Sequence, residues 1–137
     1  MEFRIVEHTA DIGIEVEAGS LEELFAGAAA GMFSIIVEPE TVTAVISREI
    51  ALHAADLGEL MFTWLNELLY LLYVKALVPS RFEAKRIDGT DLEVTVWGET
   101  LDLRRHRMLE EVKAATYHQM TVSKRDHGWF ARVIFDV

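Results

Sequence analysis

The chain has 137 residues, 51% of them apolar, and its 13 basic and 23 acidic residues give a formal net charge of −10. This length suits one domain with a sizeable core, and the apolar content excludes a disordered chain. The negative charge disfavours a protein that binds nucleic acid by itself or attaches to anionic membranes, because both ligands are polyanions. The sequence contains no cysteine, which excludes disulfides and thiolate zinc sites and leaves oxygen or imidazole as metal ligands.

The sequence predicts a cytoplasmic protein formed by a single domain over residues 1–137. The N-terminus has no basic stretch followed by an apolar run, which is the pattern of a secretory signal. The longest apolar segment, 60–78, is interrupted by Asn66, Glu67 and Lys75, so it predicts a helix with a buried face rather than a membrane span. We expect Asn66 and Glu67 to serve helix packing or to satisfy polar groups.

The first half of the chain mixes strands and helices. Alternating or apolar runs predict strands over 3–6, 12–18 and 42–53. Ser20 and Asp56 each precede an apolar pattern of period 3.6 and have a glutamate three positions later, which predicts the N-termini of two helices, each with one apolar face. Gly27 and Gly31 in the first helix predict a close contact with a sheet, and Pro79 is expected to end the second helix.

The second half of the chain is rich in strands. Two hairpins are predicted around glycine-containing turns, the first from 81–87 and 92–97 and the second from 112–124 and 129–137. Residues 101–109 between the hairpins are charged and irregular. Because the strands cluster at the end instead of alternating with helices, we expect an α+β fold, a two-layer sandwich with two helices on one face of a mixed β-sheet.

Residues 8–11, His-Thr-Ala-Asp, connect the first two predicted strands. A histidine and an aspartate beside a strand start can form a catalytic dyad, a metal site or an ordinary turn. Asx and Ser/Thr turns are common, so these residues on their own favour a turn.

The C-terminal residues offer a second candidate site. Alternation along the last predicted strand directs Asp136 away from its apolar face, and Val137 adds a terminal carboxylate close by. If Asp11 joined them, three hard oxygen ligands would converge, and such a set suits Ca²⁺ or Mg²⁺ better than zinc. A solvated terminal carboxylate is the ordinary alternative.

Lys113 stands near the start of a predicted strand, where lysines are usually solvated. Its functional alternative is a cation that contacts a phosphate or a partner's carboxylate. Basic residues also gather in three short clusters, 85–86, 104–107 and 124–125. We interpret these clusters as solvated faces, with local RNA contact as the alternative.

Four motifs occur in order along the chain, HTADIG at 8–13, WLNELLY at 64–70, EVKAATYH at 111–118 and VIFDV at 133–137. Together they resemble the archease family, with the first motif as its opening signature and the second as its central helix. The resemblance covers essentially the whole chain. One departure is that residues 98–102 lack a proline associated with this loop in relatives, but no expected ligand lies there.

The resemblance implies an archease fold and an accessory role for the tRNA-splicing ligase RtcB. Archeases promote guanylylation of the ligase histidine, which uses GTP and a divalent metal, and so allow multiple turnover in tRNA splicing and RNA repair. The resemblance assigns metal ligands to Asp11, Asp136 and Val137, the last through its backbone or terminal carboxylate. Calcium is the expected ion, with magnesium or manganese as alternatives. Asp11 and Lys113 are implied to act in ligase activation.

The resemblance also suggests supporting residues and further partners. His8 and Thr9 are expected to support the Asp11 loop, His8 by orienting it, whereas the role of His118 stays open. Older descriptions of the family name a chaperone or modulator of proteins acting on tRNA, so a tRNA methyltransferase or an RNA helicase is a further candidate partner. We expect no catalytic residue, no direct nucleic-acid binding and no membrane association.

Two other function classes remain as alternatives. A metal-dependent phosphohydrolase could use the same carboxylates to bind Mg²⁺ and activate water, although the sequence offers no clear second metal set or nucleophile. A general RNA-binding chaperone is disfavoured by the net charge of −10.

Overall fold

A computed structural model describes residues 1–7 and 11–137. The predicted supporting residues His8 and Thr9 lie outside the described residues. The described elements are two α-helices, α1 (Leu21–Ile36) and α2 (Leu57–Tyr73), a short 3-10 helix at Pro39–Thr41 and seven strands. The strands are β1 (Glu2–Glu7), β2 (Asp11–Ala18), β3 (Ile46–His53), β4 (Leu77–Ile87), β5 (Asp91–Thr100), β6 (Ala114–Arg125) and β7 (Gly128–Asp136).

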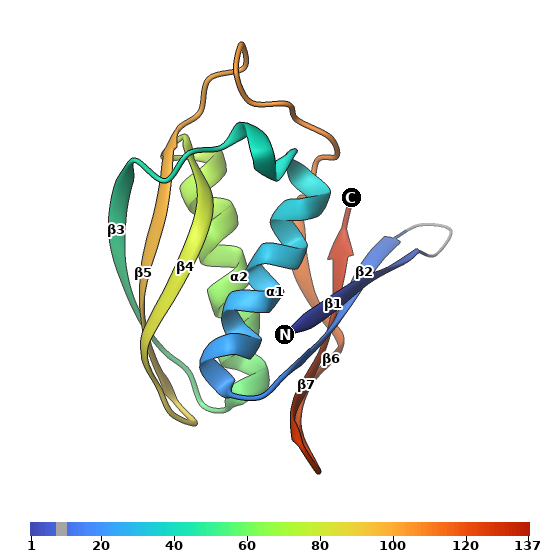
Figure 1. The fold of residues 1–137 in the computed structure, drawn as a ribbon. Helices are drawn as coiled ribbons and strands as arrows, with labels where there is room; N and C mark the ends of the chain where they lie inside the picture. The colour runs from blue at the N-terminus through green and yellow to red at the C-terminus, as the bar shows by residue number, and fades with distance from the viewer. Residues whose placement is uncertain (8–10) are drawn as a thin grey trace.

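The α+β class and the two helices are confirmed, but the arrangement of the sheets differs from the expectation. The strands form two antiparallel sheets, ordered β1-β2-β7-β6 and β3-β5-β4, instead of one mixed sheet. Figure 1 shows both helices between the two sheets, and each helix contacts strands of both. The molecule therefore has a layer of sheet on each side of the helices.

The reason for the second sheet is that α1 is apolar almost all the way around. A helix with a single apolar stripe needs one covering layer, whereas a helix that is apolar on all sides must be covered on all sides. The buried residues of α1 are Leu24, Phe25, Gly27, Ala28, Ala29, Gly31, Met32, Phe33, Ile35 and Ile36. The separate sheets supply the two covers.

Both predicted helix starts are confirmed by their N-caps. The Ser20 hydroxyl accepts a hydrogen bond from the Glu23 amide at 3.2 Å, and the Asp56 carboxylate accepts one from the Glu59 amide at 2.9 Å. Such caps satisfy amides that have no partner within the helix.

The predicted end of the second helix is wrong. Helix α2 ends at Tyr73, whereas Pro79 lies inside β4 next to a shift in its pairing with β5. The backbone turns at Ala76, where φ is 55°, and this left-handed conformation cannot continue a right-handed helix.

The predicted close contact at Gly27 and Gly31 is confirmed. A Cβ atom added at Gly27 would lie 3.1 Å from a methyl carbon of Val16, and one added at Gly31 would lie 3.3 Å from Ile14. The two glycines therefore allow α1 to lie close to β2.

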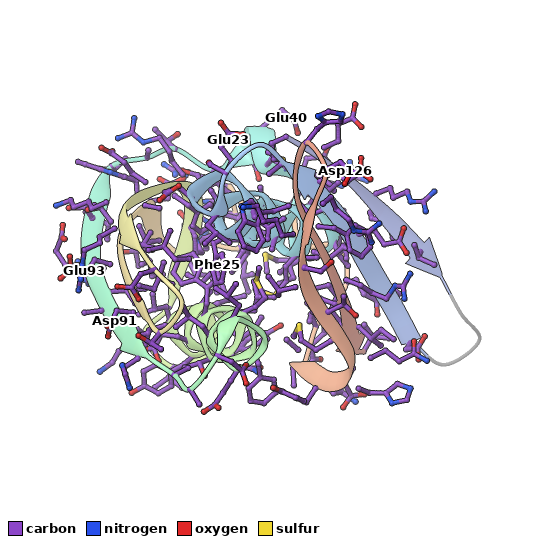
Figure 2. All side chains as sticks on the ribbon, turned by 90° about the horizontal axis from the view of Figure 1, so that it is seen from below. Glu23, Phe25, Glu40, Asp91, Glu93 and Asp126 are labelled. Carbon is purple, nitrogen blue, oxygen red and sulfur yellow. The ribbon has the colours of Figure 1, made fainter. Side chains whose placement is uncertain are left out.

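Aromatic side chains join the two helices and β4 at the centre of the core. The Trp64 ring of α2 is fully buried, packs edge-on against Phe82 of β4, and donates a 3.0 Å hydrogen bond from Nε1 to the Phe25 carbonyl of α1. Figure 2 shows Phe25 in the interior, whereas Glu93 lies at the periphery. In the described part of the chain, neither helix is long and apolar enough to cross a membrane.

Two tryptophans allow a matched test of this core. We expect Trp64→Phe to lower the free energy of unfolding by about 2–4 kcal/mol, because it removes a buried hydrogen bond and leaves a cavity. Trp97→Phe should change it by less than about 1 kcal/mol, because Trp97 Nε1 is buried without a hydrogen-bond partner among the described residues. Urea unfolding measures both free energies. Equal losses in the two variants would contradict the stabilising role assigned to the Trp64 hydrogen bond.

Candidate functional site

The two aspartates predicted to hold a metal are brought together by the pairing of β2 with β7. Asp11 lies directly opposite Asp136 in this antiparallel pair. Directly opposite residues point to the same face of a sheet, with Cβ atoms about 4.5–5.5 Å apart. The two carboxylates are therefore neighbours at one end of the four-stranded sheet.

This register follows from the apolar pattern of both strands. Ile12 pairs with Phe135, and Ile14 pairs with Val133, so these side chains all face the helices. A slip of one residue would turn every one of them to the other face. Burial of the core thus sets the carboxylates opposite each other.

Among the described residues, no basic side chain forms an ion pair with Asp11 or Asp136. Asp11 is partly buried, and its Oδ1 atom is buried with no hydrogen-bond donor in the described ranges 1–7 and 11–137. A carboxylate oxygen removed from water without a donor is unfavourable, and like charges directly opposite on a sheet repel. A cation between Asp11 and Asp136 would remove both costs, so these residues fit a divalent metal that prefers oxygen ligands.

A complete set of side-chain ligands is not present. Among the described residues, no group of three or more histidine, aspartate or glutamate side chains could hold a metal ion. Val137 follows Asp136 directly after β7, so the third predicted ligand would be a main-chain oxygen.

Lys113 lies beside this pair, immediately before β6. Its amide donates a 2.8 Å hydrogen bond to the Asp136 carbonyl. Its side chain is exposed, and within the described residues no carboxylate lies within 4.0 Å of its ammonium group. Asp136, a predicted metal ligand, thus holds the backbone of Lys113, while the ammonium group of Lys113 is available to a partner.

Helix α2 holds the segment around Lys113 from the inner side. The Asn66 side chain accepts from the Ala115 amide at 3.0 Å and donates to the Ala115 carbonyl at 3.1 Å, which confirms its expected role in satisfying polar groups. The Tyr73 hydroxyl donates to the Val112 carbonyl at 2.9 Å. Burial raises the pKa of the Tyr73 phenol above its ordinary 10, which favours the protonated form that donates this hydrogen bond.

His118 is not brought to the carboxylate pair. It is exposed, further along β6 than Ala114, the residue that pairs with Asp136. It also lies in an irregular stretch, because the pairing with β7 shifts between Thr116 and Thr121.

The segment that leads to Lys113 begins at a buried carboxylate that the sequence did not reveal. Glu99 accepts hydrogen bonds from the Thr43 amide at 2.9 Å, from His106 at 2.7 Å and from the Arg105 guanidinium. The Asp102 amide donates to His106 Nδ1 at 2.9 Å, so the proton of the neutral ring is on Nε2 and points to Glu99. The interpretation of 104–107 as a solvated face is therefore wrong for His106, which is buried.

These donors strongly favour the charged form of Glu99. The hydrogen bond from His106, followed by those from Thr43 and Arg105, lowers the pKa of Glu99 from 4.5 to about 2. The carboxylate thus remains ionised at every physiological pH.

The fold and the site define a class of small α+β proteins, with two antiparallel sheets around two helices and a cross-strand pair of carboxylates at one end. Residues 3–137 match the model of the archease protein family (MTH1598/TM1083). The chain belongs to this family.

Relatives and solved structures agree with this assignment. Protein archease of Pyrococcus abyssi is 40% identical over an alignment of 136 positions. The alignment covers 96% of this chain and 95% of the relative. The solution structure of Methanobacterium thermoautotrophicum protein 1598 superposes with a TM-score of 0.85 at 33% identity and 98% coverage of both chains. A Thermotoga maritima crystal structure, described as an archease and possible chaperone, has a TM-score of 0.67 at 24% identity, covers 96% and 94% of the two chains, and supports the fold alone.

The Glu99 network predicts a specific pH dependence. The folded-state pKa of Glu99 is lower than its ordinary 4.5, so its contribution is present above pH 4.5 and is lost as the pH falls through about 2. We expect Glu99→Gln to be less stable than wild type at pH 7, with the difference narrowing below pH 4.5. Denaturant unfolding across this range measures it. The exposed variant Glu110→Gln is the control, and a Glu99→Gln deficit independent of pH would contradict the network.

Repulsion between Asp11 and Asp136 predicts that removing one charge stabilises the metal-free protein. In the presence of EDTA, Asp136→Asn should raise the free energy of unfolding by about 0.5–1 kcal/mol. The control Asp126→Asn removes the same charge from the exposed β6–β7 turn and should change it by less than about 0.5 kcal/mol. A loss of stability in Asp136→Asn would refute the uncompensated pair.

Proposed function

We propose that this archease is a non-catalytic accessory factor that activates an RtcB-type tRNA-splicing ligase in the cytoplasm. It would promote the GTP-dependent guanylylation of the ligase and thereby multiple turnover. The observation that carries the proposal is the position of the Asp11–Asp136 pair next to Lys113, in a chain of the archease family.

The carboxylate pair is proposed to hold a divalent metal. Asp11 and Asp136 would be ligands together with a main-chain oxygen of Val137, and such hard oxygen donors suit calcium, with magnesium or manganese as alternatives. The buried Oδ1 atom of Asp11, which has no hydrogen-bond partner among the described residues, supports this proposal. A bound ion would neutralise the repulsion and fix the end of β7 against the start of β2.

Lys113 is proposed to contact the ligase. Its exposed ammonium can bind a phosphate of the nucleotide or a carboxylate of the ligase, and its backbone is held by Asp136 and, through Val112, by Tyr73. The acidic end around the carboxylate pair would also complement the basic rim of an enzyme that binds RNA, which favours association.

Two other functions are weaker candidates. A modulator of a tRNA methyltransferase, or a partner of an RNA helicase, would fit the chaperone description of the Thermotoga maritima protein. A metal-dependent phosphohydrolase would need more ligands, because the described residues hold no group of three metal-binding side chains.

Stimulation of the ligase tests the proposal. We expect Asp11→Ala, Asp136→Ala and Lys113→Ala each to reduce the stimulation of ligase guanylylation at least about tenfold, the effect of losing one strong charged contact. The measurement is transfer of labelled GMP to the ligase encoded in the same genome. Lys124→Ala, at the far hairpin, is the control for loss of a lysine. Full stimulation by all three variants would rule out the proposed site.

A further inference from the structure

The loop that follows β5 presents the most exposed large apolar side chain of the described residues. Leu103 is 73% exposed, and we call residues 101–107 the Leu103 loop. The loop borders a shallow hollow of about 660 Å³, which is lined in part by Val45, Ile46, Leu101 and Leu103. An exposed leucine at the edge of a hollow lined by both apolar and charged residues is typical of an interaction surface.

The same loop carries cations in a chain with a net charge of −10. Arg104 and Arg107 are exposed, and in the part of the chain that the structure describes no carboxylate lies within 4.0 Å of either guanidinium. Arg105 is paired with the buried Glu99. The loop that carries the leucine therefore also carries two guanidiniums without an ion-pair partner among the described residues, and a guanidinium can make bidentate contacts with a carboxylate.

The Leu103 loop is held rigidly despite its exposure. The Asp102 carboxylate accepts from the Arg104 amide at 2.9 Å, and the Asp102 carbonyl accepts from the amides of Arg105 at 3.0 Å and His106 at 2.8 Å. The Arg107 carbonyl accepts from the Glu38 amide at 2.8 Å. Together with the Glu99–His106 hydrogen bond, these contacts fix the loop before binding, which lowers the entropy lost on association.

We propose that the Leu103 loop docks an acidic segment of the partner protein, with Leu103 in an apolar pocket of the partner and Arg104 and Arg107 on its carboxylates. This inference rests on the proposed function and assigns separate roles to two surfaces. The Leu103 loop supplies affinity for the ligase, and the carboxylate pair with Lys113 supplies activation.

RNA is a poorer fit to this loop than a protein. Residues 101–107 contain no phenylalanine, tyrosine or tryptophan on which bases could stack, and the only aromatic ring, that of His106, is buried. Asp102 adds an exposed negative charge beside the arginines. The leucine also requires an apolar pocket, which a phosphate backbone does not offer.

The test separates affinity from activation. Ligase guanylylation is measured while wild type, Arg104→Glu/Arg107→Glu, Leu103→Ser and Lys113→Ala are titrated against the ligase, and calorimetry gives the affinity of each. We expect the two loop variants to need at least about tenfold more protein for half-maximal stimulation but to reach the wild-type maximum. Lys113→Ala should lower the maximum, and its half-saturating concentration should rise less than that of the loop variants.

A matched control is Lys124→Glu, which reverses a charge on the β6–β7 hairpin, at the opposite end of the molecule from the Leu103 loop (Figure 1).

Wild-type affinity in both loop variants would overturn the docking surface while leaving the proposed function intact. If wild type gave no stimulation, the proposed function would fail, and weaker calorimetric binding of the loop variants would still support docking. Gel shifts with tRNA that are lost only in the loop variants would overturn the proposal in favour of RNA.

Discussion

The pairing of β2 with β7 is the constraint on which the candidate site depends. The apolar faces of both strands must cover α1, and this requirement sets Asp11 opposite Asp136. The core therefore forces together two like charges that would otherwise repel. In a chain with a net charge of −10, such a juxtaposition is unfavourable unless the pair binds a cation. Lys113 is held at the same place, because its amide bonds the Asp136 carbonyl.

The two sheets around the helices place the two proposed surfaces at the same end of the molecule. The long connection from β5 to β6 passes over this end (Figure 1), starts at Leu101, two residues after the buried Glu99, and finishes at Lys113. The Glu99–His106 hydrogen bond fixes its first part, and the bonds of Asn66 and Tyr73 fix its last. A rigid connection of this kind can present an affinity surface and an activating lysine to one partner at a constant separation.

Local features of the fold were predictable from the sequence, whereas features that depend on distant pairing were not. The caps at Ser20 and Asp56 involve residues three positions apart, so the motif contains all the information. The number of sheets depends on how α1 is covered on all sides, which a search for a single apolar face does not reveal.

The same contrast between local features and features that depend on distant pairing applies to the candidate site. The family resemblance implied that Asp11 and Asp136 lie together, but only the strand register makes them direct neighbours. The contact of Tyr73 with Val112 and the burial of His106 within a basic cluster had no signal in spacing or composition, because both arise from tertiary packing.

Calcium binding by the isolated protein tests the central claim most directly. Isothermal titration calorimetry of the EDTA-treated protein should show one calcium site, and Asp136→Asn should weaken it at least about tenfold, since a neutral amide replaces a charged ligand. Absence of calcium, magnesium and manganese binding to wild type, or equal calcium affinity in Asp136→Asn, would contradict the claim that this carboxylate pair holds a cation.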